Sequence, residues 1–248
     1  MDAQIRGTTM PVLEVRLDPG ESVVAESGRL GWINDGLELS TSSALGGADG
    51  LWDAAKRSLS GGSFFMTTYS ASTQPGIVTF PASLPGTIFP VALGQGRSYL
   101  IQQRGFLAGT PDVELTSAFQ TKHLGPAMFG GLGIVLQRLQ GEGSAWVELP
   151  GEVVEYDLQP GQTLRVHPGH IGLVEATVDY ELTTVPGLKN KLLGGDGLFL
   201  VKLTGPGKIW LQTLSLALIA EAIEAGLVVA QQLQHQNGSP GLSLGLRI

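Results

Sequence analysis

The sequence holds two histidines that could contribute to a metal site, His167 and His170, three residues apart. Pro168 and Gly169 lie between them, and such a pair is typical of a turn. A cupin-type metal centre needs an H-x-H pair with a following Glu and a later His on neighbouring strands, and the sequence contains no H-x-H. We therefore predict that the two histidines lie at a turn, and we expect no bound metal and no cofactor.

Glycine pairs and carboxylate pairs could serve nucleotide binding or acid–base chemistry. The G-x-G turns at residues 141–143 and 205–207 each lack the third glycine of G-x-G-x-x-G. A strand follows each turn, where a helix N-terminus would be needed to hold phosphate. Paired acids such as Glu152 and Glu155 lie on strand-like segments, where a solvated face is their ordinary role. Walker A, G-x-S-x-G and H-E-x-x-H motifs do not occur, so we nominate no catalytic residue and expect no enzyme.

Trp146 and Trp210 are the candidate ligand-binding residues, because an indole can form a stacking platform. Each tryptophan closes a copy of one pattern: GGLGIVLQRLQGEGSAWVE from residue 130 and GGDGLFLVKLTGPGKIWLQ from residue 194 align without a gap. The pattern predicts two strands joined as a hairpin through the G-x-G turn, with the tryptophan just after it. Since the tryptophan recurs with its module, the main interpretation is a core anchor, and the ligand platform is the alternative.

A third copy of the pattern lies near the N-terminus. The segment DPGESVVAESGRLGW from residue 18 matches QPGQTLRVHPGHIGL from residue 159 at its Pro-Gly turn and its later glycines. We predict one all-β domain of three tandem modules, each a short double-stranded β-helix or sandwich, with boundaries near 1–84, 85–149 and 150–213. Each unit leaves strand edges open, so the copies are expected to pack with pseudo-threefold symmetry.

Two segments with helical spacing interrupt the strands. Residues 51–60 place Leu51 and Trp52 on one face and Lys56 and Arg57 on the other, which predicts a short amphipathic helix. Its main interpretation is a lid over a sheet edge, and the alternative is a surface for a partner or a membrane. A second helix is predicted from residue 214 onward. The last residues, LSLGLRI, alternate like an edge strand that is open to a partner.

Composition excludes several classes of function. The net charge is −7 and the 15 Lys and Arg residues are scattered, so no basic stripe could neutralise the phosphates of double-stranded DNA. The absence of cysteine excludes disulfides and thiolate metal sites. The first residues show no secretory signal, and no apolar run reaches the roughly 20 residues of a membrane span. A cytoplasmic protein is expected.

Five longer strings span nearly the whole chain: SGGSFFMTTYS, FLAG, MFGGLGIVLQRLQGEG, LLGGDGLFLVKLTGPGKIWLQTL and LALIAEAI. Together they resemble the bacterial branch of the family related to the mitochondrial altered-inheritance-of-mitochondria biogenesis protein. The resemblance implies a fold similar to the tryptophan RNA-binding attenuator protein. It also implies a role in assembly without enzymatic activity, because mitochondrial members of the family are implicated in inner-membrane organisation.

The leading hypothesis is a non-enzymatic interaction or scaffold protein, with a protein partner or self-association and a link to membrane or envelope organisation. The alternative is a module that binds a small ligand or RNA in clefts between the β modules, near Trp146 and Trp210. A peripheral contact with a membrane surface through the predicted helix at 51–60 is a third hypothesis.

Overall fold

The structure is a computed structural model that describes residues 1–42, 66–117, 136–184, 199–216, 218–220, 223 and 226. Contacts divide the chain into two units, Met1–Leu214 and Ser215–Ile248. In the second unit every described residue from Leu216 onward is helical, which confirms a helix after residue 214. The Ile219 N–H donates to the Ser215 carbonyl at 3.1 Å where this helix begins. The helix predicted at 51–60 and the strand predicted at 242–248 lie outside the described residues.

Met1–Leu214 is built almost entirely of antiparallel strands, so the all-β prediction is confirmed. Module 1 contains β1 (Asp2–Arg6), β2 (Val12–Leu17), β3 (Ser22–Glu26), β4 (Leu37–Ser42), β5 (Met66–Ala71) and β6 (Gly76–Pro81). Module 2 contains β7 (Gly86–Leu93), β8 (Tyr99–Gln102), β9 (Phe106–Gly109), β10 (Val113–Ser117), β11 (Leu136–Gly141) and β12 (Gly143–Pro150). Module 3 contains β13 (Val153–Leu158), β14 (Thr163–Val166), β15 (Ile171–Glu175), β16 (Asp179–Thr184), β17 (Phe199–Thr204) and β18 (Gly207–Gln212), with the short 3₁₀ turn η1 (Pro168–His170) before β15.

One antiparallel strand pair has the same register in all three modules. β2 pairs with β6, β7 with β12 and β13 with β18, and in each pair a leucine faces the first glycine of the second strand. The pairs are Leu17 with Gly76, Leu93 with Gly143 and Leu158 with Gly207. The repeat seen in the sequence is therefore also a repeat of backbone pairing, and these pairs define corresponding positions below.

The strands on either side of each G-x-G turn do not pair with each other, which corrects the hairpin prediction. β11 pairs with β8 and β10, whereas β12 pairs with β7 and β9. The turn is a corner at which the chain passes from one sheet of the sandwich to the other. Gly141 and Gly143 have φ angles of 109° and 106°, and a Cβ on Gly141 would lie 2.1 Å from the Asp112 carbonyl oxygen. Glycines with positive φ suit a corner as well as a hairpin, so the sequence pattern fits both.

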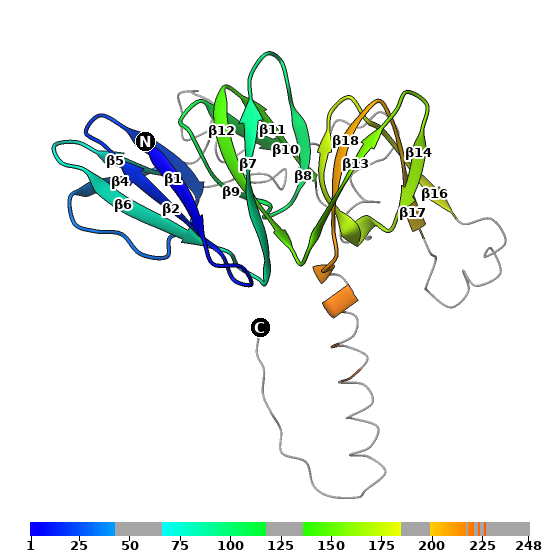
Figure 1. Cartoon of the computed structure of the whole chain (residues 1–248), viewed down its shortest axis with the longest axis horizontal. Coiled ribbons are helices and arrows are strands. Elements are labelled where there is room, and N and C mark those ends of the chain that lie inside the picture. The colour runs from blue at the N-terminus through cyan, green and yellow to red at the C-terminus, as the bar shows by residue number, and fades with distance from the viewer. Residues whose placement is uncertain are drawn as a thin grey trace, which may run out of the picture. The chain divides into compact units, whose positions relative to one another are not determined.

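Neighbouring modules share their sheets. β3 pairs with β9 and β8 pairs with β15, which produces two six-stranded sheets, β4-β5-β3-β9-β12-β7 and β10-β11-β8-β15-β18-β13. Two three-stranded sheets remain, β1-β2-β6 in module 1 and β14-β17-β16 in module 3. Figure 1 shows the modules following one another in chain order. Among the described strands none pairs module 3 with module 1, so the modules form an open row, and the pseudo-threefold arrangement stays a prediction.

Candidate functional site

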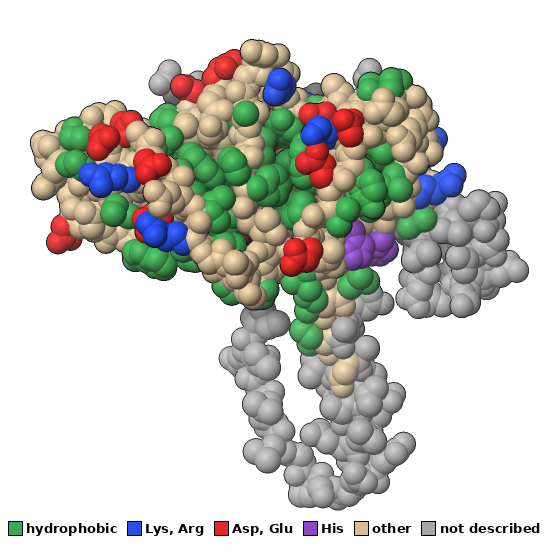
Figure 2. Space-filling view, viewed as in Figure 1, with side chains coloured by type: hydrophobic (Ala, Val, Ile, Leu, Met, Phe, Trp, Pro, Cys, Tyr) green, Lys and Arg blue, Asp and Glu red, His purple; other side chains and the backbone are tan. Residues whose placement is uncertain are grey.

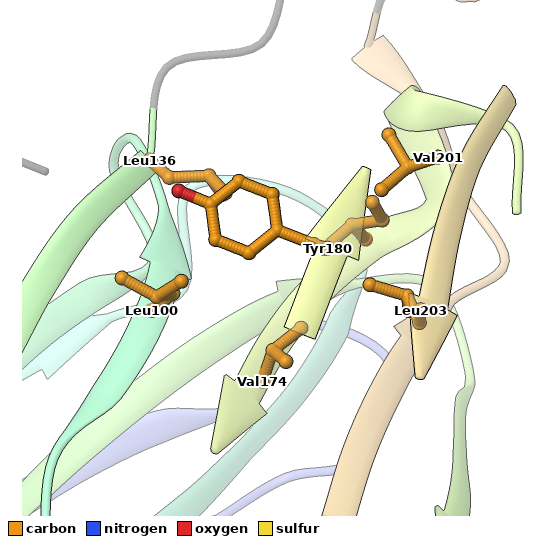
Figure 3. A pocket seen from close by; sticks show the side chains of 7 residues that line it. Leu100, Leu136, Val174, Tyr180, Val201 and Leu203 are labelled. Atoms are coloured by element: carbon orange, nitrogen blue, oxygen red, sulfur yellow. The ribbon is translucent and has the colours of Figure 1, made fainter. Parts of the chain in front are cut away.

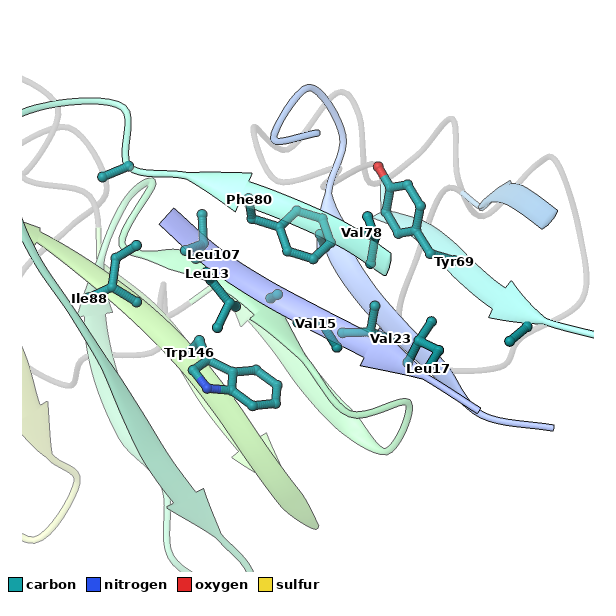
Figure 4. Close-up of a cluster of buried hydrophobic side chains, with 14 residues drawn as sticks. Leu13, Val15, Leu17, Val23, Tyr69, Val78, Phe80, Ile88, Leu107 and Trp146 are labelled. Atoms are coloured by element: carbon teal, nitrogen blue, oxygen red, sulfur yellow. The ribbon is translucent and has the colours of Figure 1, made fainter. Parts of the chain in front are cut away.

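Apolar side chains of both modules fill the contact between modules 1 and 2, and each such contact between neighbouring modules is called a joint below. Leu107, Ala108 and Trp146 of module 2 share one buried cluster with Leu13 and Val15 of module 1 (Figure 4). Trp146 is only 6% exposed. Its ring therefore has no accessible face for stacking a ligand, and it packs as a core anchor at the joint.

The joint between modules 2 and 3 is built in the same way. Trp210 stacks with Phe89 at a ring-centroid distance of 6.5 Å and meets the Tyr99 ring edge-on at 6.0 Å. Leu173 of module 3 is fully buried in the core cluster of module 2. The two tryptophans singled out by the sequence thus occupy corresponding places, one at each joint.

A buried ion pair crosses the first joint. The Arg29 guanidinium contacts the Glu148 carboxylate, and each residue is 8% exposed. Arg29 also donates to the Ser83 hydroxyl and the Arg104 carbonyl. The Ser83 N–H donates to the second Glu148 oxygen at 2.8 Å. Both charges are therefore satisfied by hydrogen bonds that connect module 1 to module 2.

Gln212 takes the place of Glu148 at the second joint. Glu148 faces Ile88 on β7, and Gln212 faces Val153 at the corresponding place on β13. The Gln212 amide donates to Gln102 Oε1 at 2.8 Å, which connects module 3 to module 2, and to the Gly169 carbonyl at 3.0 Å. These polar residues carry no recognisable sequence motif, because nothing local in a sequence marks a contact between distant segments.

Module 3 ends in an open groove of about 440 Å³. Its apolar wall is formed by Val154, Tyr156, Leu164, Val166 and Leu211. Val154 is 42% exposed and Tyr156 is 44% exposed. Their counterparts in module 1, Leu13 and Val15, are fully buried because module 2 covers them. The groove is thus the surface that the next module covers at the other two positions.

The rim of the groove carries His167, which caps η1, and His170, the last residue of η1. His170 Nδ1 lies 2.8 Å from the Gln212 carbonyl oxygen, and the Gly169 N–H donates to His167 Nδ1 at 3.3 Å. Histidine side chains lie beside hydrophobic ones on the face shown in Figure 2. Within the described ranges no group of three His, Cys, Asp or Glu residues could hold a metal ion. The histidines lie at a turn, as their Pro-Gly spacer predicted.

A second, much smaller hollow lies where modules 2 and 3 meet, because its lining includes Leu100 and Leu136 of module 2. Leu100, Val174, Tyr180 and Leu203 are among its lining residues (Figure 3), and its volume is about 10 Å³. That is space for at most one water molecule, and apolar walls leave a water without hydrogen-bond partners. Burial raises the pKa of the Tyr180 hydroxyl, so the group stays neutral. This hollow is a packing defect of the core and offers no ligand site.

The residues proposed as a membrane or partner surface, Leu51, Trp52, Lys56 and Arg57, lie outside the described residues. The lid and the membrane-surface interpretations therefore stay predictions. In the part of the chain that the structure describes, no helix has the length and apolar character needed to cross a membrane.

Gln137 on β11 provides a test of core packing. It is 1% exposed, and neither atom of its amide has a hydrogen-bond partner within the described part of the chain. A buried polar group without a partner costs about 1–3 kcal/mol. Gln137→Leu is therefore expected to raise the free energy of unfolding by about 1–3 kcal/mol, measured by urea denaturation. The matched control is Gln140→Leu, which removes a 2.9 Å bond to Glu114 and should not stabilise. A destabilised Gln137→Leu variant would contradict the expectation.

These features define an all-β sandwich protein of three related modules that share sheets edge to edge. The chain belongs to the family described as Mitochondrial biogenesis AIM24, whose model matches residues 3–214, nearly the same range as the first unit. The X-ray crystal structure of a Streptococcus pyogenes protein is similar, with a TM-score of 0.70 and 22% identity over 90% of this chain and 98% of that one. At this identity the likeness shows the fold alone. No curated protein sequence matches the chain.

Proposed function

We propose that this protein is a non-enzymatic interaction protein whose contact surface is the open end of its row of modules. The groove of module 3 is the observation that supports this role. Val154 and Tyr156 expose apolar surface at positions where module 1 has the fully buried Leu13 and Val15, and where module 2 has the partly buried Phe89 and the buried Val91. Apolar surface exposed in a groove favours association, because its removal from water contributes about 25 cal/mol per Å² before the entropic cost of association is subtracted.

The distribution of titratable groups supports a role without catalysis. Active sites usually gather groups with shifted pKa values in a cleft. In the described ranges, burial raises the pKa of Tyr69, Tyr99 and Tyr180, which are parts of the fold. The Lys208 ammonium holds the pKa of the Glu155 carboxyl below its usual range, in a surface pair. None of these groups lines the groove.

The assembly role also fits the family to which the chain belongs. The family description speaks of mitochondrial biogenesis, and the role in assembly is what the sequence resemblance implies. A link to membrane or envelope organisation and a cytoplasmic address stay predictions.

The peripheral membrane contact predicted for residues 51–60 is tested by co-sedimentation with liposomes. If Trp52→Ala leaves the sedimented fraction unchanged, the prediction is contradicted.

Chemical cross-linking in a cell lysate tests the interaction role. Wild-type chain is expected to be cross-linked to specific proteins, and Tyr156→Glu is expected to lose them because a carboxylate would be buried at the contact. Leu39→Glu is the matched control, since Leu39 is 53% exposed on β4, away from the groove. Equal capture by wild-type chain and Tyr156→Glu, or no capture by either, would contradict the proposal.

A further inference from the structure

We infer that the partner of the groove is module 1 of a second copy of this chain, which adds its Trp32 segment to the free edge of β14. This inference rests on the proposed interaction role and names its partner. It follows from the two joints within the chain, which show how one module of this fold receives the next. Among the described strands, each end of the row has one edge that pairs with a neighbouring module at the other joints but has no such partner here.

The first unmatched edge is β14. Its counterparts are β3 and β8, and each of them pairs on one side within its own module and on the other side with the next module. β14 pairs within its module with β17, and among the described strands it has no neighbour on its other side. An edge strand of this kind presents unpaired N–H and C=O groups that another strand can match.

The second unmatched edge is the segment around Trp32 in module 1. Ile33 pairs with Val78 on β6, as Val174 of β15 pairs with Ile209 on β18. The segment is therefore the counterpart of β15, and likewise of β9. Those two strands also pair with the preceding module, through β8 and β3. Within the described part of the chain the Trp32 segment has no such neighbour.

The two existing joints predict the register of the third. The pairs Ala25↔Ala108 and Ile101↔Leu173 occupy corresponding places. Val166 corresponds to Ala25, because each lies five residues after the glycine of its Pro-Gly turn. Trp32 corresponds to Leu173, because each directly precedes one of two corresponding paired residues. These are Ile33, which pairs with β6, and Val174, which pairs with β18. Val166 of one copy should therefore face Trp32 of the next, and Arg165 should face Ile33.

This register directs the Trp32 side chain into the groove. Side chains that face each other across an antiparallel pair lie on the same side of the sheet. Val166 lines the groove, so Trp32 would lie over the groove beside it. Trp32 is 56% exposed, whereas its counterparts Ala108 and Leu173 are fully buried in the core of the preceding module. The exposed indole and the exposed apolar wall are thus the two halves of one incomplete joint.

A contact of this kind is head-to-tail, because the two copies use different surfaces. Each copy still has one free edge after pairing, so the assembly grows by whole chains until it closes into a ring or continues as a filament. The mass of the assembly is therefore expected to be a multiple of the 26.0 kDa chain.

Light scattering during size-exclusion chromatography of the full chain tests the assembly. Wild-type chain is expected to elute as a multiple of 26.0 kDa. Trp32→Glu and Tyr156→Glu, one on each half of the joint, should both shift the mass to 26.0 kDa. Leu39→Glu should keep the wild-type mass. A monomeric wild-type chain, or an assembly whose mass neither Trp32→Glu nor Tyr156→Glu changes, would overturn the inference.

Disulfide trapping tests the register itself, because the chain contains no cysteine. Directly opposite residues of an antiparallel pair have Cα atoms about 4.5–5.5 Å apart, within the range of a disulfide. Mixing the single variants Ile33→Cys and Arg165→Cys under mild oxidation should give a covalent dimer on a non-reducing gel. The matched control mixes Ile33→Cys with Thr163→Cys, which lies two residues along β14, too far for a bridge. Equal trapping by both mixtures would overturn the register.

The experiments separate this inference from the proposed function. A chain that is monomeric and is not trapped by Arg165→Cys, but still loses cross-linked proteins in Tyr156→Glu, would overturn self-pairing and keep the interaction role. A chain that assembles and is trapped in register supports both.

Discussion

Replacing Arg29 with alanine is expected to lower the free energy of unfolding by about 3–5 kcal/mol, the range for breaking a buried ion pair. The change leaves the Glu148 carboxylate buried with the Ser83 N–H at 2.8 Å and without its cation. It also removes the donors to the Ser83 hydroxyl and the Arg104 carbonyl. Urea denaturation followed by circular dichroism measures the loss.

Two controls separate the buried pair from charge removal in general. Arg6→Ala breaks a surface ion pair with Glu14 at 2.7 Å in which the arginine is 57% exposed, and it should cost about 0–1 kcal/mol. The double variant Arg29→Met with Glu148→Leu removes both charges and should recover much of the lost stability, because no unpaired charge stays buried. If Arg29→Ala lowers the free energy of unfolding no more than Arg6→Ala does, the result would contradict the stabilising role of the buried Arg29–Glu148 ion pair.

Trp146→Ala is expected to lower the free energy of unfolding by about 3–5 kcal/mol. The indole is 6% exposed and fills the joint between modules 1 and 2 beside Leu13 and Val15. Its removal leaves a cavity that rigid strands on both sides cannot close. The measurement is again urea denaturation.

Trp32→Ala is the matched control for Trp146. Trp32 is 56% exposed, so in dilute protein, where copies are separate, its loss should change stability by less than about 0.5 kcal/mol. Equal effects of the two substitutions would contradict the placement of Trp146 in the core.

The sequence predicts the strand content well, because strand content depends on local signals. The strands around the G-x-G turns, such as β17 and β18, follow from apolar runs bounded by glycines. Trp146 lies in the core, as its recurrence with the module indicated. The pairing of the strands does not follow, because positive-φ glycines such as Gly141 suit a corner between sheets as well as a hairpin.

The groove could not be predicted from local pattern. The segment VVEYDL of β13 matches VLEVRL of β2 in its alternation, so the sequence alone gives Val154 and Tyr156 the same burial as Leu13 and Val15. Their exposure depends on whether another module follows in space. The Arg29–Glu148 pair was equally hidden, because the two residues lie 119 positions apart in the sequence.

Hydrogen exchange of backbone amides is the most direct test of the joints within and between chains, because it reports which strand edges are paired. Slow exchange is expected in β3, β8, β9 and β15 of both the wild-type chain and Tyr156→Glu, since these strands join the modules within one chain. Slow exchange is expected in β14 of the wild-type chain and fast exchange in β14 of Tyr156→Glu. Fast exchange at β3 and β9, or the same protection of β14 in both proteins, would contradict this pairing of strands.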